Sequence, residues 1–160
     1  MLTISFLVTG FVAMAQVKND VLSQVDALLF DSRYAEAIQK IDQQANVNVD
    51  TQIRLMNKKA EALIGLGKYE DADKILQEAI GKCKDSKNNE VLKAITQSSL
   101  GYLHLNQGRF DQALEHLTAA SATLQERGSP LETAQALTNL GSTYNSTGKY
   151  LQAEEQFQMA

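Results

Sequence analysis

The chain has 160 residues, of which 44% are hydrophobic and 21% are charged, and its formal net charge at pH 7 is −4. This is the composition of an ordinary soluble domain, and the acidic balance argues against a general nucleic-acid binder, which needs a basic face. With one proline, no tryptophan and long runs rich in Ala, Leu, Gln, Glu and Lys, the chain is expected to be helical nearly throughout.

The first fifteen residues, MLTISFLVTGFVAMA, carry no charge and are mostly apolar. They are too few to span a bilayer, which takes roughly 20 residues, and they end in Ala13-Met14-Ala15, the small-x-small pattern of a signal-peptide cleavage site. We therefore predict a signal peptide at 1–15 and a mature chain at 16–160 that is periplasmic or secreted and does not insert into the membrane. Because no Lys or Arg precedes the apolar run, either the true start lies upstream or the run is no signal. The alternatives are a buried N-terminal helix in a cytoplasmic protein and an uncleaved anchor.

Periodic apolar residues separated by polar breaks predict eight helices along the mature chain. Their expected ranges are 18–31, 33–46, 51–66, 68–84, 89–107, 109–127, 130–147 and 149–160. The start of the seventh helix is the clearest, since in the segment RGSPLE Gly128 ends the preceding helix and Ser129 is the expected N-cap. Pro130 then takes the first helical position, and Glu132 completes a capping box.

Cys83 is the only cysteine, so no intramolecular disulfide is possible and the fold depends on packing alone. It continues the helical face of Leu76, Ala79 and Ile80, which predicts a small buried thiol. The alternative is a reactive thiol or one that pairs with another molecule.

A set of small, apolar and turn-forming residues recurs along the chain with constant internal spacing. The second and third copies are 41 residues apart, the third and fourth are 40 apart, and a fainter first copy lies 35 residues before the second. In chain order the four copies are Val25, Ser32, Tyr34, Ala37, Ile41, Gln44; Ala60, Gly67, Tyr69, Ala72, Leu76, Ala79; Gly101, Gly108, Phe110, Ala113, Leu117, Ala120; and Gly141, Gly148, Tyr150, Ala153, Phe157, Ala160.

This pattern resembles the tetratricopeptide repeat (TPR), a helix–turn–helix unit whose copies stack on one another. The resemblance covers residues 17–160 and is best in the fourth copy, where Leu140, Gly141 and Tyr144 match the first helix of the family's unit. No copy has the family's early tryptophan, and the spacing of 40 and 41 exceeds the usual 34, as in relatives with extended helices. The resemblance implies an all-α fold, an α-solenoid of about four stacked antiparallel helix pairs.

The glycines of this pattern have two expected roles. Gly141 lies within a helix, where glycine costs roughly 1 kcal/mol relative to alanine, so we expect a neighbouring helix to approach it closely. Equivalent positions hold Val25, Ala60 and Gly101, and the matching small residues of the second helices are Ala37, Ala72, Ala113 and Ala153. Tyr150 and Phe157 are expected to fill the gaps between repeats.

The second kind of glycine is expected to end the first helix of each pair. Gly67, Gly108 and Gly148 occupy this position, where a left-handed residue is wanted, and Ser32 is a poorer substitute in the first copy.

The last predicted helix runs to Ala160 with no polar-faced helix after it, although a repeat array needs one to cover its end. We expect either that the chain is incomplete at its C-terminus or that the exposed end is a docking surface, for example for self-association.

No constellation typical of an enzyme is present, so we predict no catalytic residue, no metal and no cofactor. His104 takes the position that Tyr144 fills in the next copy and is expected to be a packed structural residue. His116 is expected to be solvated, and the spacing of the two histidines fits no metal motif.

The family resemblance also implies a ligand site, because in this family the first helices line a concave groove that holds peptides. Matching the groove positions gives Arg54, Asn57, Lys58 and Glu61 from the second copy; Ile95, Ser98, Ser99, Tyr102 and Leu105 from the third; and Gln135, Thr138, Asn139, Ser142 and Asn145 from the fourth. The asparagines are expected to hydrogen-bond an extended peptide backbone. Arg54 and Lys58 are expected to bind an acidic side chain or a terminal carboxylate, and the alternative for these charges is a solvated surface.

The function expected from these features is a non-enzymatic scaffold module that binds a protein or peptide, with no nucleic-acid partner. The alternative is the extracytoplasmic sensory input segment of a larger bacterial signalling protein, a sensor kinase or regulator, since long-period arrays behind a signal peptide resemble such segments.

Overall fold

The computed structural model describes residues 20–160, so the predicted signal peptide at 1–15 lies outside the described residues. Between residues 20 and 160 the chain forms eight α-helices and one short 3₁₀ helix, and no strand. The helices are α2 (Val21–Phe30), α3 (Tyr34–Asp42), α4 (Val49–Gly65), α5 (Tyr69–Lys82), η1 (Cys83–Asp85), α6 (Asn89–Asn106), α7 (Phe110–Arg127), α8 (Pro130–Ser146) and α9 (Tyr150–Met159). The predicted all-α fold is confirmed.

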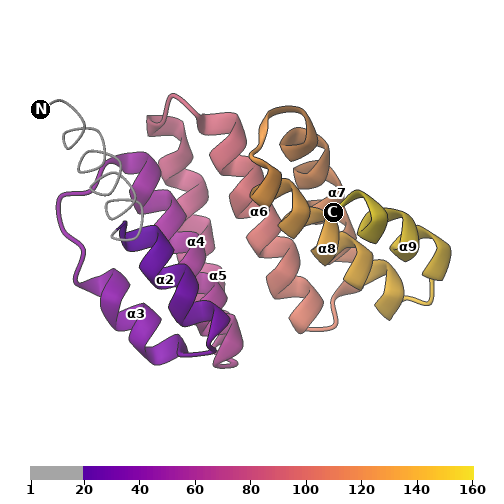
Figure 1. Cartoon of the computed structure of the whole chain (residues 1–160), viewed down its shortest axis with the longest axis horizontal. Helices are drawn as coiled ribbons and strands as arrows, with labels where there is room; N and C mark the ends of the chain where they lie inside the picture. Colours follow the sequence, from indigo (N-terminus) through magenta and orange to yellow (C-terminus); the bar gives the residue numbers. More distant parts are fainter. Residues whose placement is uncertain (1–19) are drawn as a thin grey trace, which may run out of the picture.

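The helices form four antiparallel pairs that stack along the long axis of the molecule (Figure 1). The pairs are α2 with α3, α4 with α5, α6 with α7, and α8 with α9. The first helix of each pair also packs against the first helix of the next, and each second helix packs against the following first helix. This connectivity is the predicted α-solenoid. None of the helices described is both long and apolar enough to cross a membrane.

The same turn closes each helix pair. Ser32, Gly67, Gly108 and Gly148 all have φ between 57° and 75°, as the repeat pattern predicted. After each of them, the next backbone N–H reaches back to a carbonyl five residues earlier, as in the bond from Lys68 N to Leu63 O at 2.8 Å. This is the Schellman closure that satisfies carbonyls left free at a helix end. In the first copy this position is held by Ser32, so a residue with a Cβ adopts the left-handed conformation there, whereas the other three copies have glycine.

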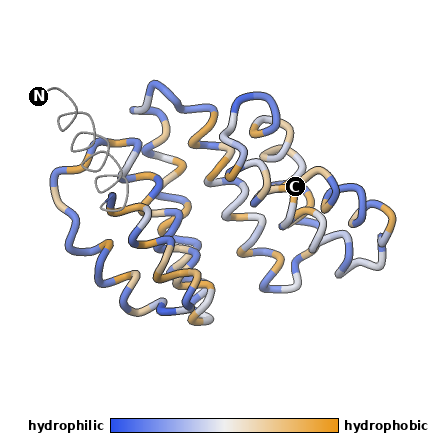
Figure 2. The backbone as a smooth tube through the Cα atoms, viewed as in Figure 1, coloured by the Kyte–Doolittle hydropathy of each residue, from blue (hydrophilic) through white to orange (hydrophobic). Residues whose placement is uncertain are grey.

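Close approach of the two helices in a pair accounts for the small residues inside them. A Cβ added to Gly141 would lie 2.6 Å from the Phe157 ring, and one added to Gly101 would run into the side chain of Leu117, which is fully buried. The matching alanines of the second helices are all buried, namely Ala37, Ala72, Ala113 and Ala153. Apolar positions recur along each helix between polar ones (Figure 2), so every helix has an apolar face to bury against its neighbours.

The two large aromatic residues of the last helix pair, Tyr150 and Phe157, do not fill gaps between pairs as the sequence predicted. Phe157 fills the space above Gly141 within its own pair rather than a gap between pairs. Tyr150 is 69% exposed. Its equivalent in the first pair, Tyr34, packs against Gly65 of the following first helix, and no described helix lies beyond α9.

Several helix boundaries differ from the prediction for local reasons. The helix α4 begins at Val49, two residues early, because the side chain of Asn48 accepts a hydrogen bond from Thr51 N at 2.9 Å and caps it. The capping box of Ser129 and Glu132 is present at the start of α8, as predicted.

Cys83 is buried directly after α5 and its thiol donates to Ala79 O, which agrees with the structural role expected for it.

Substitution at Gly101 tests the close approach. Gly101→Ala should lower the free energy of unfolding by about 1–3 kcal/mol, because the new methyl group meets Leu117 in a filled core. The matched control is Gly81→Ala, since nothing lies within 4 Å of that added Cβ and the better helix former should raise stability by about 0.5–1 kcal/mol. Urea unfolding followed by circular dichroism measures both. Stabilisation by Gly101→Ala would contradict the packing account.

Exchange at the turn positions tests the left-handed closure. Ser32→Gly should raise the free energy of unfolding by about 1 kcal/mol, because glycine adopts positive φ without a steric cost. The reverse change, Gly108→Ser, should lower it by a similar amount. Thermal melting of both variants provides the comparison, and equal melting temperatures for wild type and both variants would show that φ at these turns carries no strain.

Candidate functional site

A cleft lies on the face that α4, α6 and α8 form together and has a volume of about 370 Å³, within the range of ligand-binding clefts. Most of its lining comes from these three first helices, with one residue from α7. The lining residues are Glu61, Ile64, Ile95, Ser98, Ser99, Tyr102, Leu124, Glu132, Ala134, Gln135, Thr138 and Asn139.

The structure brings eight of the fourteen groove candidates together around this cleft: Glu61, Ile95, Ser98, Ser99, Tyr102, Gln135, Thr138 and Asn139. Leu105, Ser142 and Asn145 do not line it. Their part in binding a ligand stays a prediction.

Asn57 lies in the core instead of on the groove surface, and only 5% of it is exposed. Its amide nitrogen donates to Ile53 O at 2.9 Å and to Thr96 Oγ1 at 3.0 Å, so it joins α4 to α6. An amide held in this way has no donor left for a peptide backbone.

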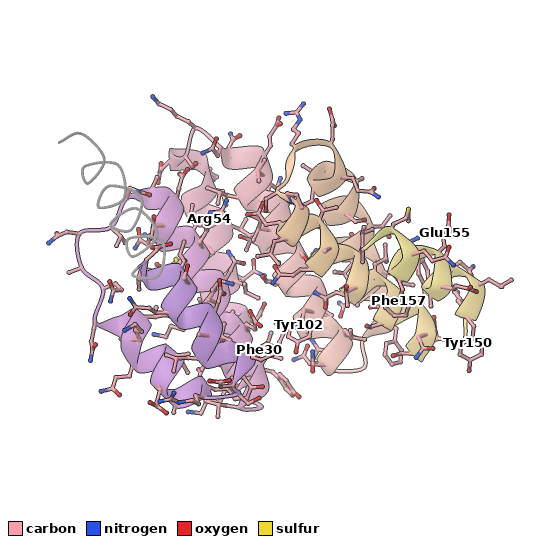
Figure 3. The ribbon with its side chains drawn as sticks, viewed as in Figure 1. Phe30, Arg54, Tyr102, Tyr150, Glu155 and Phe157 are labelled. Atoms are coloured by element: carbon pink, nitrogen blue, oxygen red, sulfur yellow. The ribbon has the colours of Figure 1, made fainter. Side chains whose placement is uncertain are left out.

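The two groove cations are each paired with an acid on another helix. The Arg54 guanidinium on α4 pairs with the Glu132 carboxylate on α8, and Lys58 Nζ lies 2.5 Å from Asp26 Oδ1 on α2. Figure 3 shows Arg54 higher in the view and Tyr102 lower, toward opposite ends of the first helices. Each of these cations therefore already has one acidic partner, and the predicted binding of an acidic side chain or terminal carboxylate by Arg54 and Lys58 stays a prediction.

Both carboxylate oxygens of Glu132 have hydrogen-bond partners within the fold. One carboxylate oxygen accepts from Arg54 and the other accepts from Ser129 N at 2.9 Å. Burial alone would raise the pKa of the Glu132 carboxyl, but the hydrogen bonds from Arg54 and Ser129 outweigh burial and hold the pKa below its usual value. Its carboxylate therefore stays charged and paired.

Glu61 has no such partner. Within residues 20–160 its carboxylate makes no hydrogen bond and no ion pair, although Lys58 lies one turn earlier on the same helix. Burial raises the pKa of the Glu61 carboxyl, with the charge of Lys58 acting in the opposite direction. Glu61 is thus the one charged group of the described cleft lining that no other residue neutralises by direct contact.

The rest of the cleft is a mixed surface of amides, hydroxyls and apolar groups. The side-chain amides of Gln135 and Asn139 have no hydrogen-bond partner within the described residues, and they lie one turn apart on α8. Tyr102 is half-buried on α6, and burial raises the pKa of its hydroxyl. Ile64 and Leu124 supply apolar wall.

Four lining residues were not among the groove candidates. Ile64 lies three residues after Glu61, so helical periodicity could have found it. Glu132 was read only as a cap, Ala134 adjoins the candidate Gln135, and Leu124 comes from a second helix. The contribution of Leu124 depends on how α7 packs against α8, which no local pattern shows.

The two histidines are stacked on one another. The ring centroids of His104 on α6 and His116 on α7 are 5.3 Å apart with 16° between their planes. His116 is therefore packed and half-buried, and the expectation that it is solvated is wrong. Nδ1 of His104 is buried without a hydrogen-bond partner among the described residues. No group of three or more metal-binding side chains occurs in the part of the chain that is described.

Comparison with known families finds a match to the model described as tetratricopeptide repeat, over residues 51–126 and again over 92–160. The two matches together span most of the chain and cover all three first helices that line the cleft. A comparison with curated proteins gives no significant match.

The histidine stack predicts a pH effect on stability. Burial and the neighbouring His116 lower the pKa of His104 from its ordinary value of 6.5. Because the unfolded chain then takes up the proton more readily, stability should be lost as pH falls below about 6.5. His104→Tyr, which copies Tyr144 of the next pair, should lose less stability between pH 8 and pH 5. Thermal melting at the two pH values measures this, and an equal loss in wild type and variant would contradict it.

Proposed function

Since the chain belongs to the tetratricopeptide repeat family, whose members generally mediate protein–protein interactions, we propose that it is a non-catalytic module that binds a protein or peptide segment in the cleft between α4, α6 and α8. The observation that carries the proposal is the uncommitted polar surface of that cleft. The amides of Gln135 and Asn139 offer donors and acceptors that nothing else in the described chain uses.

An extended peptide fits this surface better than a compact small molecule does. The cleft is open, it follows three parallel first helices, and its polar groups are spread along α6 and α8 instead of converging on one point. Amide side chains one helical turn apart can pair with successive backbone groups of an extended chain, while Ile64 and Leu124 cover apolar side chains.

We also propose that the mature chain works outside the cytoplasm. The uncharged apolar run at residues 1–15 and its small-x-small end support this part of the proposal.

The test uses peptides selected from a random decapeptide display library against the chain. Gln135→Ala combined with Asn139→Ala should weaken binding of the selected peptides by about 10-fold, because each lost hydrogen bond contributes about 0.5–1.5 kcal/mol. Gln152→Ala on the exposed face of α9 is the control and should change binding less than twofold. Fluorescence anisotropy gives the affinities. Unchanged binding by the double variant, with its melting temperature kept, would place the ligand elsewhere and reject the site.

A further inference from the structure

The charged residues in and beside the cleft form ion pairs, with one exception. Arg54 is bound to Glu132, and Lys58 is bound to Asp26. Among the described residues that line the cleft itself, two are acidic and none is basic. One of these acids, Glu132, has both carboxylate oxygens occupied, which leaves Glu61.

Glu61 faces the cleft beside groups that suit a cation. It lies on α4, and Tyr102 lines the same cleft from α6, which packs against α4. A carboxylate binds an ammonium or guanidinium group by charge-assisted hydrogen bonds, and the face of an aromatic ring attracts the same cation. Ser98 and Ser99 add hydroxyl oxygens to the same wall.

We propose that the cleft selects peptides that present an arginine or lysine side chain, whose cationic end pairs with Glu61 and lies against the ring of Tyr102. This inference rests on the proposed function, because it names the ligand chemistry of the same cleft. It reverses the charge preference that the sequence suggested.

An acidic ligand would meet the opposite situation. Arg54 and Lys58 are already partly neutralised by Glu132 and Asp26, and an acidic ligand would bring a further negative charge near Glu61. Like charges in an interface suppress binding. A cation gives the partly desolvated Glu61 carboxylate the partner that it lacks.

The test begins with the peptides recovered from the decapeptide library. They are made synthetically with acetylated and amidated ends, so that no terminal amine supplies the cation. Glu61→Gln should weaken binding of the selected peptides by about 10-fold or more, and Glu115→Gln on the exposed part of α7 should change it less than twofold. Replacement of the basic peptide residue by glutamine should weaken binding to wild type by a similar factor but change binding to Glu61→Gln by less than about threefold.

Two further results separate the possible outcomes. If the Gln135 and Asn139 double variant weakens binding but Glu61→Gln does not, or if the selected peptides carry acidic residues and no basic ones, the cleft binds peptides and the inference on charge is wrong. If neither variant affects any selected peptide, the proposed site and the inference fail together. Equal melting temperatures of Glu61→Gln and wild type ensure that a loss of binding reports on the cleft and not on folding.

Discussion

The distance between the two helices of each pair is the constraint on which the rest of the structure depends. At Gly101 and Gly141 the facing side chains of Leu117 and Phe157 occupy the space that a Cβ would take. Glycine in a helix is unfavourable by itself, so its presence here is offset by the dispersion contacts of a closer approach. Closely spaced pairs that repeat with the same turn place every first helix on one face, and that face carries the cleft.

Charged and polar residues beside the cleft form contacts between helices of the fold. The ion pair of Arg54 with Glu132 joins the second pair of helices to the fourth across α6, and Asn57 ties α4 to α6 from within the core. These contacts link the three first helices that line the cleft. The ion pair also compensates the positive charge of Arg54, so that Glu61 is the charged residue of the described cleft lining without a direct partner.

Local patterns predict much of this molecule, because repeats encode the same packing four times. The register of the copies was enough to place Gly67, Gly108 and Gly148 in left-handed turns and Ala113 in the core. It was also enough to bring most of the groove candidates to one cleft. The register could not predict pairings that are peculiar to one copy. Arg54 and Glu132 are 78 residues apart and have no counterparts in the other repeats, so their contact follows only from the assembled stack.

The same limit explains Asn57 and the histidines. Groove positions were transferred from the family's pattern, but Asn57 faces Thr96 of α6 and lies in the core. The stacking of His104 on His116 depends on the spacing of α6 and α7, which the helix pattern leaves open.

The most direct measurement is a titration of the ¹⁵N-labelled chain with an arginine-containing, end-blocked peptide, followed by amide chemical shifts. The account predicts that the largest shifts fall on α4 around Glu61, on α6 around Tyr102 and on α8 around Asn139, with little change on α5 or α9. Shifts concentrated on the second helices, or equal shifts with an acidic peptide of the same length, would contradict it.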